Sequence, residues 1–432
     1  MRKNKNGAKR FRLALAAVVA AALLLTGCGG GGGGGGTPSG PDDNVSTSKP
    51  EFEDAPNADG VVWQYAKNGS NSAVLVGCSS EGKAPQGAVR LPSVTDEGYV
   101  ITEVGARALA GTAVTSVTLP EKADTIGRQA FRDCTQLVSV NLQSSSRVTE
   151  IGESAFANTG LQSIVIPASV RSIGMKAFYH CTALNSVSIL GTPNMDGSEH
   201  GGIFAGCTSL NTVQLSDSTR RIADGMFAEC KSLKTIRLPS QLTEIGSAAF
   251  SKCTALEQID LPETLTRLGQ NAFAFCESLQ QVKIPAKIKK LEGYTFWYCK
   301  GLTGITLPDG MTEIGQSDFA ECRSLSSLVL PDSITAVGTN AFGGCYELQR
   351  VILPENLSTI EDYTFDRCDK LERLYIPQRV LSIGRYALSA DRSMEIYYSG
   401  SETQWGRVNK QVGNTAVSRA RMHYNALASS VN

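Results

Sequence analysis

The apolar positions of this chain recur with a constant period. Between residues 204 and 368 a phenylalanine returns every 23 residues, and a cysteine lies three residues after each one. The complete unit has the pattern F-x-x-C-x-x-L-x-x-I-x-L-P-x-x-L-x-x-I-G-x-x-A. The cysteines in this register are Cys207, Cys230, Cys253, Cys276, Cys299, Cys322, Cys345 and Cys368. A fixed period of this length predicts a solenoid, in which each unit stacks on its neighbours.

Each unit predicts one short strand and a brief return. The L-x-x-I-x-L stretch is rich in Val and Ile, which suits a strand, and the proline that usually follows cannot donate to a ladder and ends it. The next apolar residues, such as Leu242 and Ile245, are three apart, and Gly246 permits a tight turn. Ala249 and Phe250 fit a short helical turn or an irregular segment. Stacking at about 4.8 Å would pair the strands in one parallel sheet and bury the apolar columns.

The pattern continues upstream with small slips. Thr159 replaces the cysteine in one unit, and Leu109 replaces the phenylalanine in the first, degenerate unit. An insertion near residues 191–202 lengthens another unit. We therefore expect about a dozen units over residues 103–390.

The N-terminal segment predicts export and anchoring. Residues 2–12 are basic and residues 13–25 are apolar but too short to span a bilayer, so residues 1–27 are interpreted as a secretory signal peptide. Leu25-Thr26-Gly27-Cys28 resembles the lipobox of bacterial lipoproteins. That resemblance implies lipid attachment at Cys28 and a membrane anchor; the alternative is an ordinary signal peptide with a chance cysteine. Residues 28–60, rich in Gly, Pro and Ser, predict a flexible tether.

The repeating unit resembles the BspA-type leucine-rich repeat of bacterial surface proteins, over nearly all of residues 61–425. The resemblance implies a leucine-rich-repeat solenoid with a parallel β-sheet on its concave face and short helical or irregular returns. Residues 61–102 and 391–432 are similar to the N-terminal cap and to the C-terminal cap and tail of this family. The resemblance also implies binding or adhesion at an outward-facing cell envelope, without naming a ligand.

Charge argues against nucleic acid as a partner. The whole chain has 41 basic and 41 acidic residues, and residues 1–27 contain six of the basic ones and no acid. The processed chain would therefore have 35 basic and 41 acidic residues, a net charge of −6. Nucleic-acid binding requires a basic face.

The cysteine spacing favours buried thiols. No C-x-x-C pair occurs, so the usual zinc spacing is absent, and eleven cysteines remain besides Cys28, an odd number that cannot all pair. Stacked units would bring cysteines close enough for occasional disulfides. Their position between Phe and Leu nevertheless favours small apolar core residues.

Candidate binding residues flank the middle apolar position of each strand, where side chains alternate outward. They are Arg237, Asp260, Lys283, Arg350, Ile352, Arg373 and Tyr375. The last four, with Val329, combine apolar, aromatic and arginine groups as binding hot spots do, although Val, Ile and Tyr also simply favour strands. Phe275, Trp297 and Tyr298 form a second candidate group, with the alternative that they fill the convex edge.

No catalytic motif is present, and the three histidines are scattered, so we expect no enzyme, no cofactor and no metal site. Carboxylates beside the cysteines, such as Glu321, are expected on a solvated face. The leading hypothesis is a lipid-anchored surface protein that binds a macromolecular ligand, by protein–protein interaction or adhesion, through the concave face. The alternatives are a carbohydrate-binding surface lipoprotein and a purely structural envelope protein.

Overall fold

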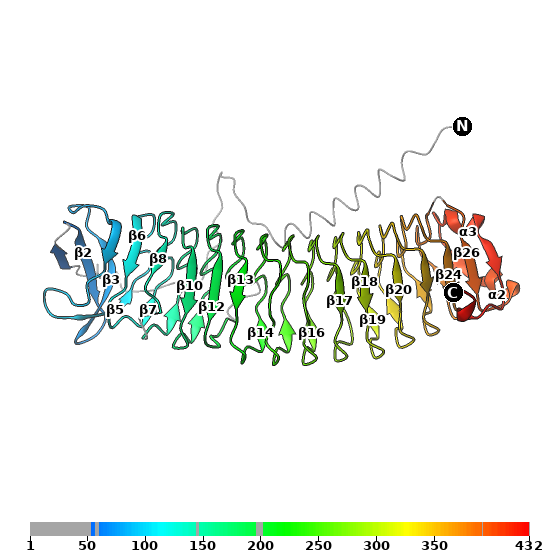
Figure 1. Cartoon of the computed structure of the whole chain (residues 1–432), viewed down its shortest axis with the longest axis horizontal. Coiled ribbons are helices and arrows are strands. Elements are labelled where there is room, and N and C mark those ends of the chain that lie inside the picture. The colour runs from blue at the N-terminus through cyan, green and yellow to red at the C-terminus, as the bar shows by residue number, and fades with distance from the viewer. Residues whose placement is uncertain (1–52, 57–59, 144–146, 196–201, 391, 432) are drawn as a thin grey trace, which may run out of the picture. The chain divides into compact units, whose positions relative to one another are not determined.

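The computed structural model describes residues 53–56, 60–143, 147–195, 202–390 and 392–431. The predicted signal peptide, Cys28, nearly all of the tether and the centre of the 191–202 insertion lie outside these residues. The compact unit Glu51–Asn432 is a parallel β-solenoid with little helix, as predicted, and it has about 14 turns where about a dozen units were expected (Figure 1). Strand β1 (Glu53–Pro56) pairs with β2 (Val62–Lys67), so the fold begins inside the segment predicted as tether.

One side of the solenoid consists of the predicted strands, which we call the front strands. They are β4 (Gln86–Arg90), β6 (Ala113–Thr118), β8 (Ser139–Val140), β10 (Ser163–Ile166), β12 (Ser186–Ile189), β13 (Thr212–Gln214), β17 (Gln281–Lys283), β18 (Gly304–Thr306), β20 (Ser327–Val329), β22 (Arg350–Ile352), β24 (Arg373–Ile376), β26 (Glu395–Tyr398) and β28 (Arg421–His423). They pair in parallel within four groups, β4–β6–β8, β10–β12–β13, β17–β18 and β20–β22–β24–β26–β28, where equivalent residues of the repeat lie side by side. The two predicted strands between β13 and β17 are extended segments with one isolated bridge, Gln258 to Gln281, so the predicted single sheet is divided.

A second series of parallel strands, which we call the back strands, was not predicted. Most have only two residues and end in an apolar side chain that points into the core. They are β5 (Val100–Val104), β7 (Thr125–Ile126), β9 (Glu150–Ile151), β11 (Ser172–Ile173), β14 (Arg221–Ile222), β15 (Glu244–Ile245), β16 (Arg267–Leu268), β19 (Glu313–Ile314), β21 (Ala336–Val337), β23 (Thr359–Ile360), β25 (Ser382–Ile383) and β27 (Asn409–Lys410), which follow β2 and β3 (Ser72–Cys78).

The return to the front strand is irregular and is also hydrogen-bonded from turn to turn. In one turn, Ala248 and Lys252 have left-handed φ values of 54° and 61°. The N–H of Phe250 donates to the carbonyl of Ala272 at 2.9 Å, and the N–H of Lys252 to that of Ala274 at 2.7 Å. The return is therefore irregular, which was one of its two predicted forms. Like the front and back strands, it forms backbone hydrogen bonds between successive turns.

The phenylalanines form a continuous column in the core. Rings from Phe131 to Phe365 stack nearly parallel between successive turns, with centroids 5.1 to 5.9 Å apart. All of them are buried. The C-terminal end is closed by the helices α2 (Glu402–Arg407) and α3 (Thr415–Arg419) and by the 3-10 helix η1 (Ala428–Val431).

The cysteines form a second buried column and are reduced. In the described part of the chain ten cysteines are buried, Cys78 is half-exposed, and none forms a disulfide. Each buried thiol donates to a carbonyl in the preceding turn: Cys134 to that of Leu109 at 2.9 Å, and the others to that of a phenylalanine, as Cys253 does to Phe227 at 3.1 Å. At the same position Thr159 donates to Phe156 within its own turn, at 2.9 Å. The interpretation as buried core thiols is confirmed.

Native thiol reactivity should therefore be confined to Cys78. Burial raises the pKa of Cys253 to about 12 and also raises the pKa of Cys78, so the reactive thiolate is scarce at these two residues. The other cysteines of the column are closed to a reagent by their burial. In a titration of a Cys28→Ser chain with a thiol-specific disulfide reagent we expect about one cysteine to react in the folded protein and the rest only in denaturant. A Cys78→Ser variant should abolish the native signal. Rapid native labelling that survives this substitution would contradict the buried column.

Candidate functional site

The outward positions of the front strands, and the equivalent positions Arg237 and Asp260 of the two turns between β13 and β17, form the predicted row of candidate residues. Arg237, Asp260, Lys283 and Arg350 are exposed, and Ile352 and Arg373 are half-buried. Val329 is 79% exposed, the highest value among the exposed large apolar side chains of the described chain. Strand pairing places Val329 beside Ile352, and Ile352 beside Tyr375. The row is thus continuous across β20, β22 and β24.

A shallow groove of about 570 Å³ lies on this face between Asp260 and Val329. Its middle is open because Gly304 has no side chain, and an added Cβ there would meet no atom within 4 Å. Lys283 stands at its edge, where its ammonium pairs with the Glu263 carboxylate at 2.8 Å. The groove therefore has a polar wall on one side and an exposed apolar side chain on the other.

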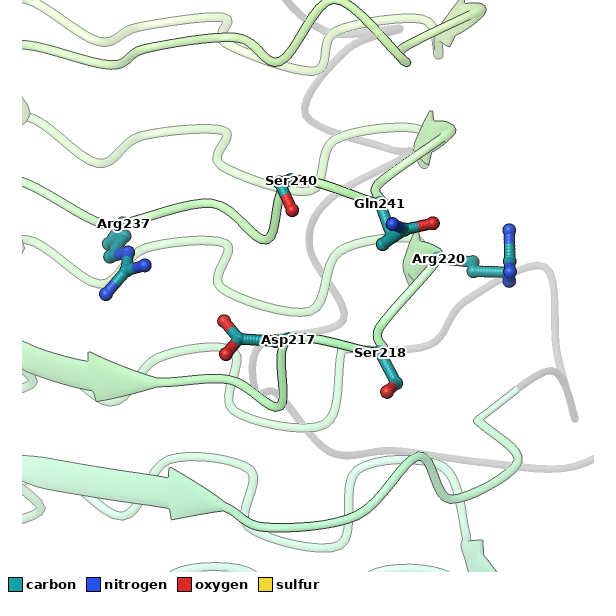
Figure 2. A pocket seen from close by; sticks show the side chains of 6 residues that line it. All are labelled: Asp217, Ser218, Arg220, Arg237, Ser240 and Gln241. Atoms are coloured by element: carbon teal, nitrogen blue, oxygen red, sulfur yellow. The ribbon is translucent and has the colours of Figure 1, made fainter.

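A second hollow of about 430 Å³ lies nearer the N-terminus, between two successive turns. Figure 2 shows Asp217 and Arg237 on neighbouring turns at this hollow, and Arg220 at its other end is also a lining residue. The candidate Arg237 is therefore separated from the groove that contains Asp260 and Lys283. The candidate residues line one face but not one pocket.

The row continues into the C-terminal cap, which the sequence had not revealed. Pairing of β24, β26 and β28 places Tyr397 beside Tyr375 and His423 beside Tyr397. In the same way Glu395 lies beside Arg373, and Arg421 beside Glu395. The rings of Tyr397 and His423 stack with centroids 4.5 Å apart. The 23-residue step is lost here, so only the strand pairing identifies these positions.

The prediction that Tyr375 is exposed is wrong. Tyr375 occupies an outward position, yet it is only 2% exposed, because η1 contacts β22, β24 and β26 on this face. Its hydroxyl donates to Glu355, and burial together with this hydrogen bond raises the pKa of Tyr375 to about 12. The guanidinium Nη1 of Arg373 donates to the Val431 carbonyl at 3.1 Å. This end of the candidate site is covered by the chain itself.

The second candidate group is mostly internal. Trp297 is 1% exposed and therefore not accessible to a ligand, contrary to its place among the binding candidates. Phe275 and Tyr298 are half-buried, and their ring centroids lie 5.0 Å apart, as expected for adjacent turns. Lys300 and Arg323 lie over the Tyr298 ring at 4.5 and 5.5 Å. The alternative that these aromatic residues fill an edge of the solenoid is favoured.

Glu321 is another correction, since its side chain is 4% exposed instead of solvated. Its carboxylate pairs with Arg323 at 3.0 Å and with Arg367, two turns away, at 3.2 Å. Gly344 in the intervening turn makes room, because an added Cβ would lie 2.8 Å from a Glu321 oxygen. Two arginines thus compensate the buried charge.

Neither a metal centre nor a membrane span is evident in the described ranges. There, no group of three or more His, Cys, Asp or Glu side chains is arranged to hold an ion. Within the same ranges, no helix has the length and apolar character needed to cross a bilayer. The geometry is that of an extended surface on a rigid support.

Fold and site together define a leucine-rich-repeat solenoid, a class that presents long binding surfaces. Residues 102–197, 200–303 and 294–407 match the model of the BspA type leucine rich repeat region. This match covers more than half of the chain, so the protein belongs to that family, which confirms the resemblance seen in the sequence.

Solved structures agree with this assignment. A leucine-rich repeat protein from Bacteroides ovatus is 25% identical, with a TM-score of 0.66, over 85% of this chain and 99% of that one. The pneumococcal vaccine antigen PcpA is 16% identical, with a TM-score of 0.51, over 86% of this chain and 98% of that one, and shares the fold. No curated protein matches the sequence.

Proposed function

We propose that the front face binds a protein ligand at the cell surface, and that the acylated Cys28 anchors the solenoid to the membrane. The main support is Val329, which is 79% exposed at the edge of the groove. An apolar side chain held in water by a rigid strand gains free energy when a partner covers it. Arginine and lysine neighbours such as Arg350 and Lys283 supply directional hydrogen bonds around it.

A protein ligand fits this face better than a glycan. The outward front positions from Thr212 to Ile352 are described throughout and include no aromatic side chain. Trp297 and Tyr375, which could have offered a flat apolar surface to a sugar ring, are buried. The exposed groups are instead mixed charges, amides and aliphatic side chains, which suit a polypeptide surface.

The proposal is tested by replacing the exposed Val329 with a charged residue. The purified chain and its Val329→Asp variant are applied to arrays of extracellular proteins and of glycans. Binding to protein spots should fall at least tenfold, about 1.4 kcal/mol, because the buried carboxylate is left unpaired. Leu381→Asp is the matched control, since Leu381 is 66% exposed outside the front strands.

Other outcomes separate the alternatives. Equal loss in the two variants would argue against the front face as the site. Signals on glycan spots alone would support the carbohydrate-binding alternative, and a lack of signal on both arrays would support a structural envelope role.

Anchoring is tested separately in a bacterial host that produces the full chain. An alkynyl fatty acid should label the wild-type protein, and the Cys28→Ser variant should lose the label and the membrane association. Label that persists in the variant would exclude acylation at Cys28.

A further inference from the structure

The C-terminal end of the front face is occupied by a short segment of the same chain. Helix η1 contacts β22, β24 and β26, and Val431 is fully buried although Ser429 and Ser430 beside it are exposed. Leu374 and Ile376 point into the solenoid core, so the intervening Tyr375 points outward, beneath this segment. Val431 and Tyr375 are thus both buried without being part of the central core.

Two interactions attach this segment to the front face: the burial of one apolar side chain and one hydrogen bond from a charged donor. Val431 is the fully buried residue of η1, and Arg373 donates to its carbonyl at 3.1 Å. The next backbone anchors lie upstream, where Asn425 and Ala426 donate to the carbonyls of Gly400 and Tyr398 at 3.0 and 3.1 Å. Leu427, between the two points of attachment, is 69% exposed. Residues 427–431 can therefore leave the face while residues 425–426 stay attached.

We propose that Ile352, Arg373, Tyr375 and Tyr397 form a peptide-binding surface, and that residues 428–431 are its built-in, displaceable occupant. The surface takes a branched apolar side chain against Tyr375 and Ile352, and the carbonyl of that residue on the Arg373 guanidinium. A partner polypeptide with this chemistry competes with η1 for the same contacts. The inference deepens the proposed function by naming the partner class, an extended peptide, for one end of the front face.

Charge adds a preference to this surface. Arg350 on β22 is exposed and paired in register with Arg373, so two arginines occupy neighbouring outward positions. Glu395 on the other flank is already engaged, since Tyr397 donates to its carboxylate at 2.7 Å and Arg421 forms an ion pair with it at 3.6 Å. A carboxylate next to the apolar residue of the partner would therefore be favoured.

The test uses a fluorescent peptide with the sequence of residues 426–432 as the probe. Its binding is measured by anisotropy to the full chain, to a chain that ends at Leu427, and to a full-length Val431→Asp variant. Both variants vacate the surface, so each should bind the peptide saturably and at least tenfold more tightly than the wild type does. Far-UV circular dichroism and thermal unfolding establish that each variant is folded.

Arg373 supplies the specificity control. Adding Arg373→Gln to the shortened chain should lower peptide affinity at least tenfold, whereas Arg379→Gln, at an exposed arginine outside the front strands, should leave it unchanged. If the folded variants bind no peptide, or if both variants unfold, η1 is a structural cap and the proposal is wrong. This readout needs no external ligand, so it remains informative if the array experiment on Val329 fails.

Discussion

Replacing Phe296 by alanine should lower the free energy of unfolding by about 3–5 kcal/mol, as for other large buried aromatic residues. The ring is fully buried. It stacks between Phe273 and Phe319 with centroid distances of 5.5 and 5.6 Å. Truncation removes both stacking contacts and leaves a cavity that the hydrogen-bonded turns on either side cannot close. Chemical denaturation followed by circular dichroism measures the change.

The control for this prediction is Thr306→Ala in the following front strand. Thr306 is exposed, and surface substitutions of this kind usually change stability by less than about 0.5 kcal/mol. An unchanged denaturation midpoint for Phe296→Ala would mean that the ring contributes nothing to the core. A broadened transition would indicate that the solenoid unfolds in segments, as expected when each turn contacts only its neighbours.

The core could be predicted from the sequence because its apolar residues recur at a fixed spacing. A phenylalanine such as Phe296 that returns at a fixed step must lie over its equivalents, and cysteines such as Cys299 three residues later must do the same. The back strands were missed for a physical reason. A strand of two residues, such as Glu244–Ile245, is too short to show the alternation by which strands are recognised.

The candidate site was predicted only in part because its end depends on contacts that no period describes. Tyr375 occupies the outward position that the repeat assigns to it, and its burial comes from η1, whose Val431 is 58 residues from Arg373 in sequence. Tyr397 and His423 extend the same row, but the steps of 22 and 26 residues to them conceal the relationship. A repeat pattern in one sequence does not show that a distant segment covers a residue. It also does not show which residues are equivalent once the 23-residue period is lost.

The glycine that follows most back strands, such as Gly269 after β16, should be as critical as an apolar core residue. A Cβ on Gly269 would lie 2.5 Å from the backbone nitrogen of Ser247 and 2.7 Å from the carbonyl carbon of Gly246. The turns cannot move apart freely, because the N–H of Gly269 donates to the Ile245 carbonyl at 2.8 Å. The glycine is thus needed for close approach of two backbones, and Gly269 does not have a positive φ.

Gly269→Ala should therefore lower the free energy of unfolding by about 1–3 kcal/mol, the usual range for overpacking, or more because the opposing atoms are backbone. Gly304→Ala is the matched control. Its Cβ would meet no atom within 4 Å, so the change should be neutral or stabilise by up to about 1 kcal/mol through the unfolded chain. Equal midpoints for the two variants in urea would show that turn-to-turn spacing is elastic at this position. Loss confined to Gly269→Ala would instead establish that backbone contact between turns limits which residue can follow β16.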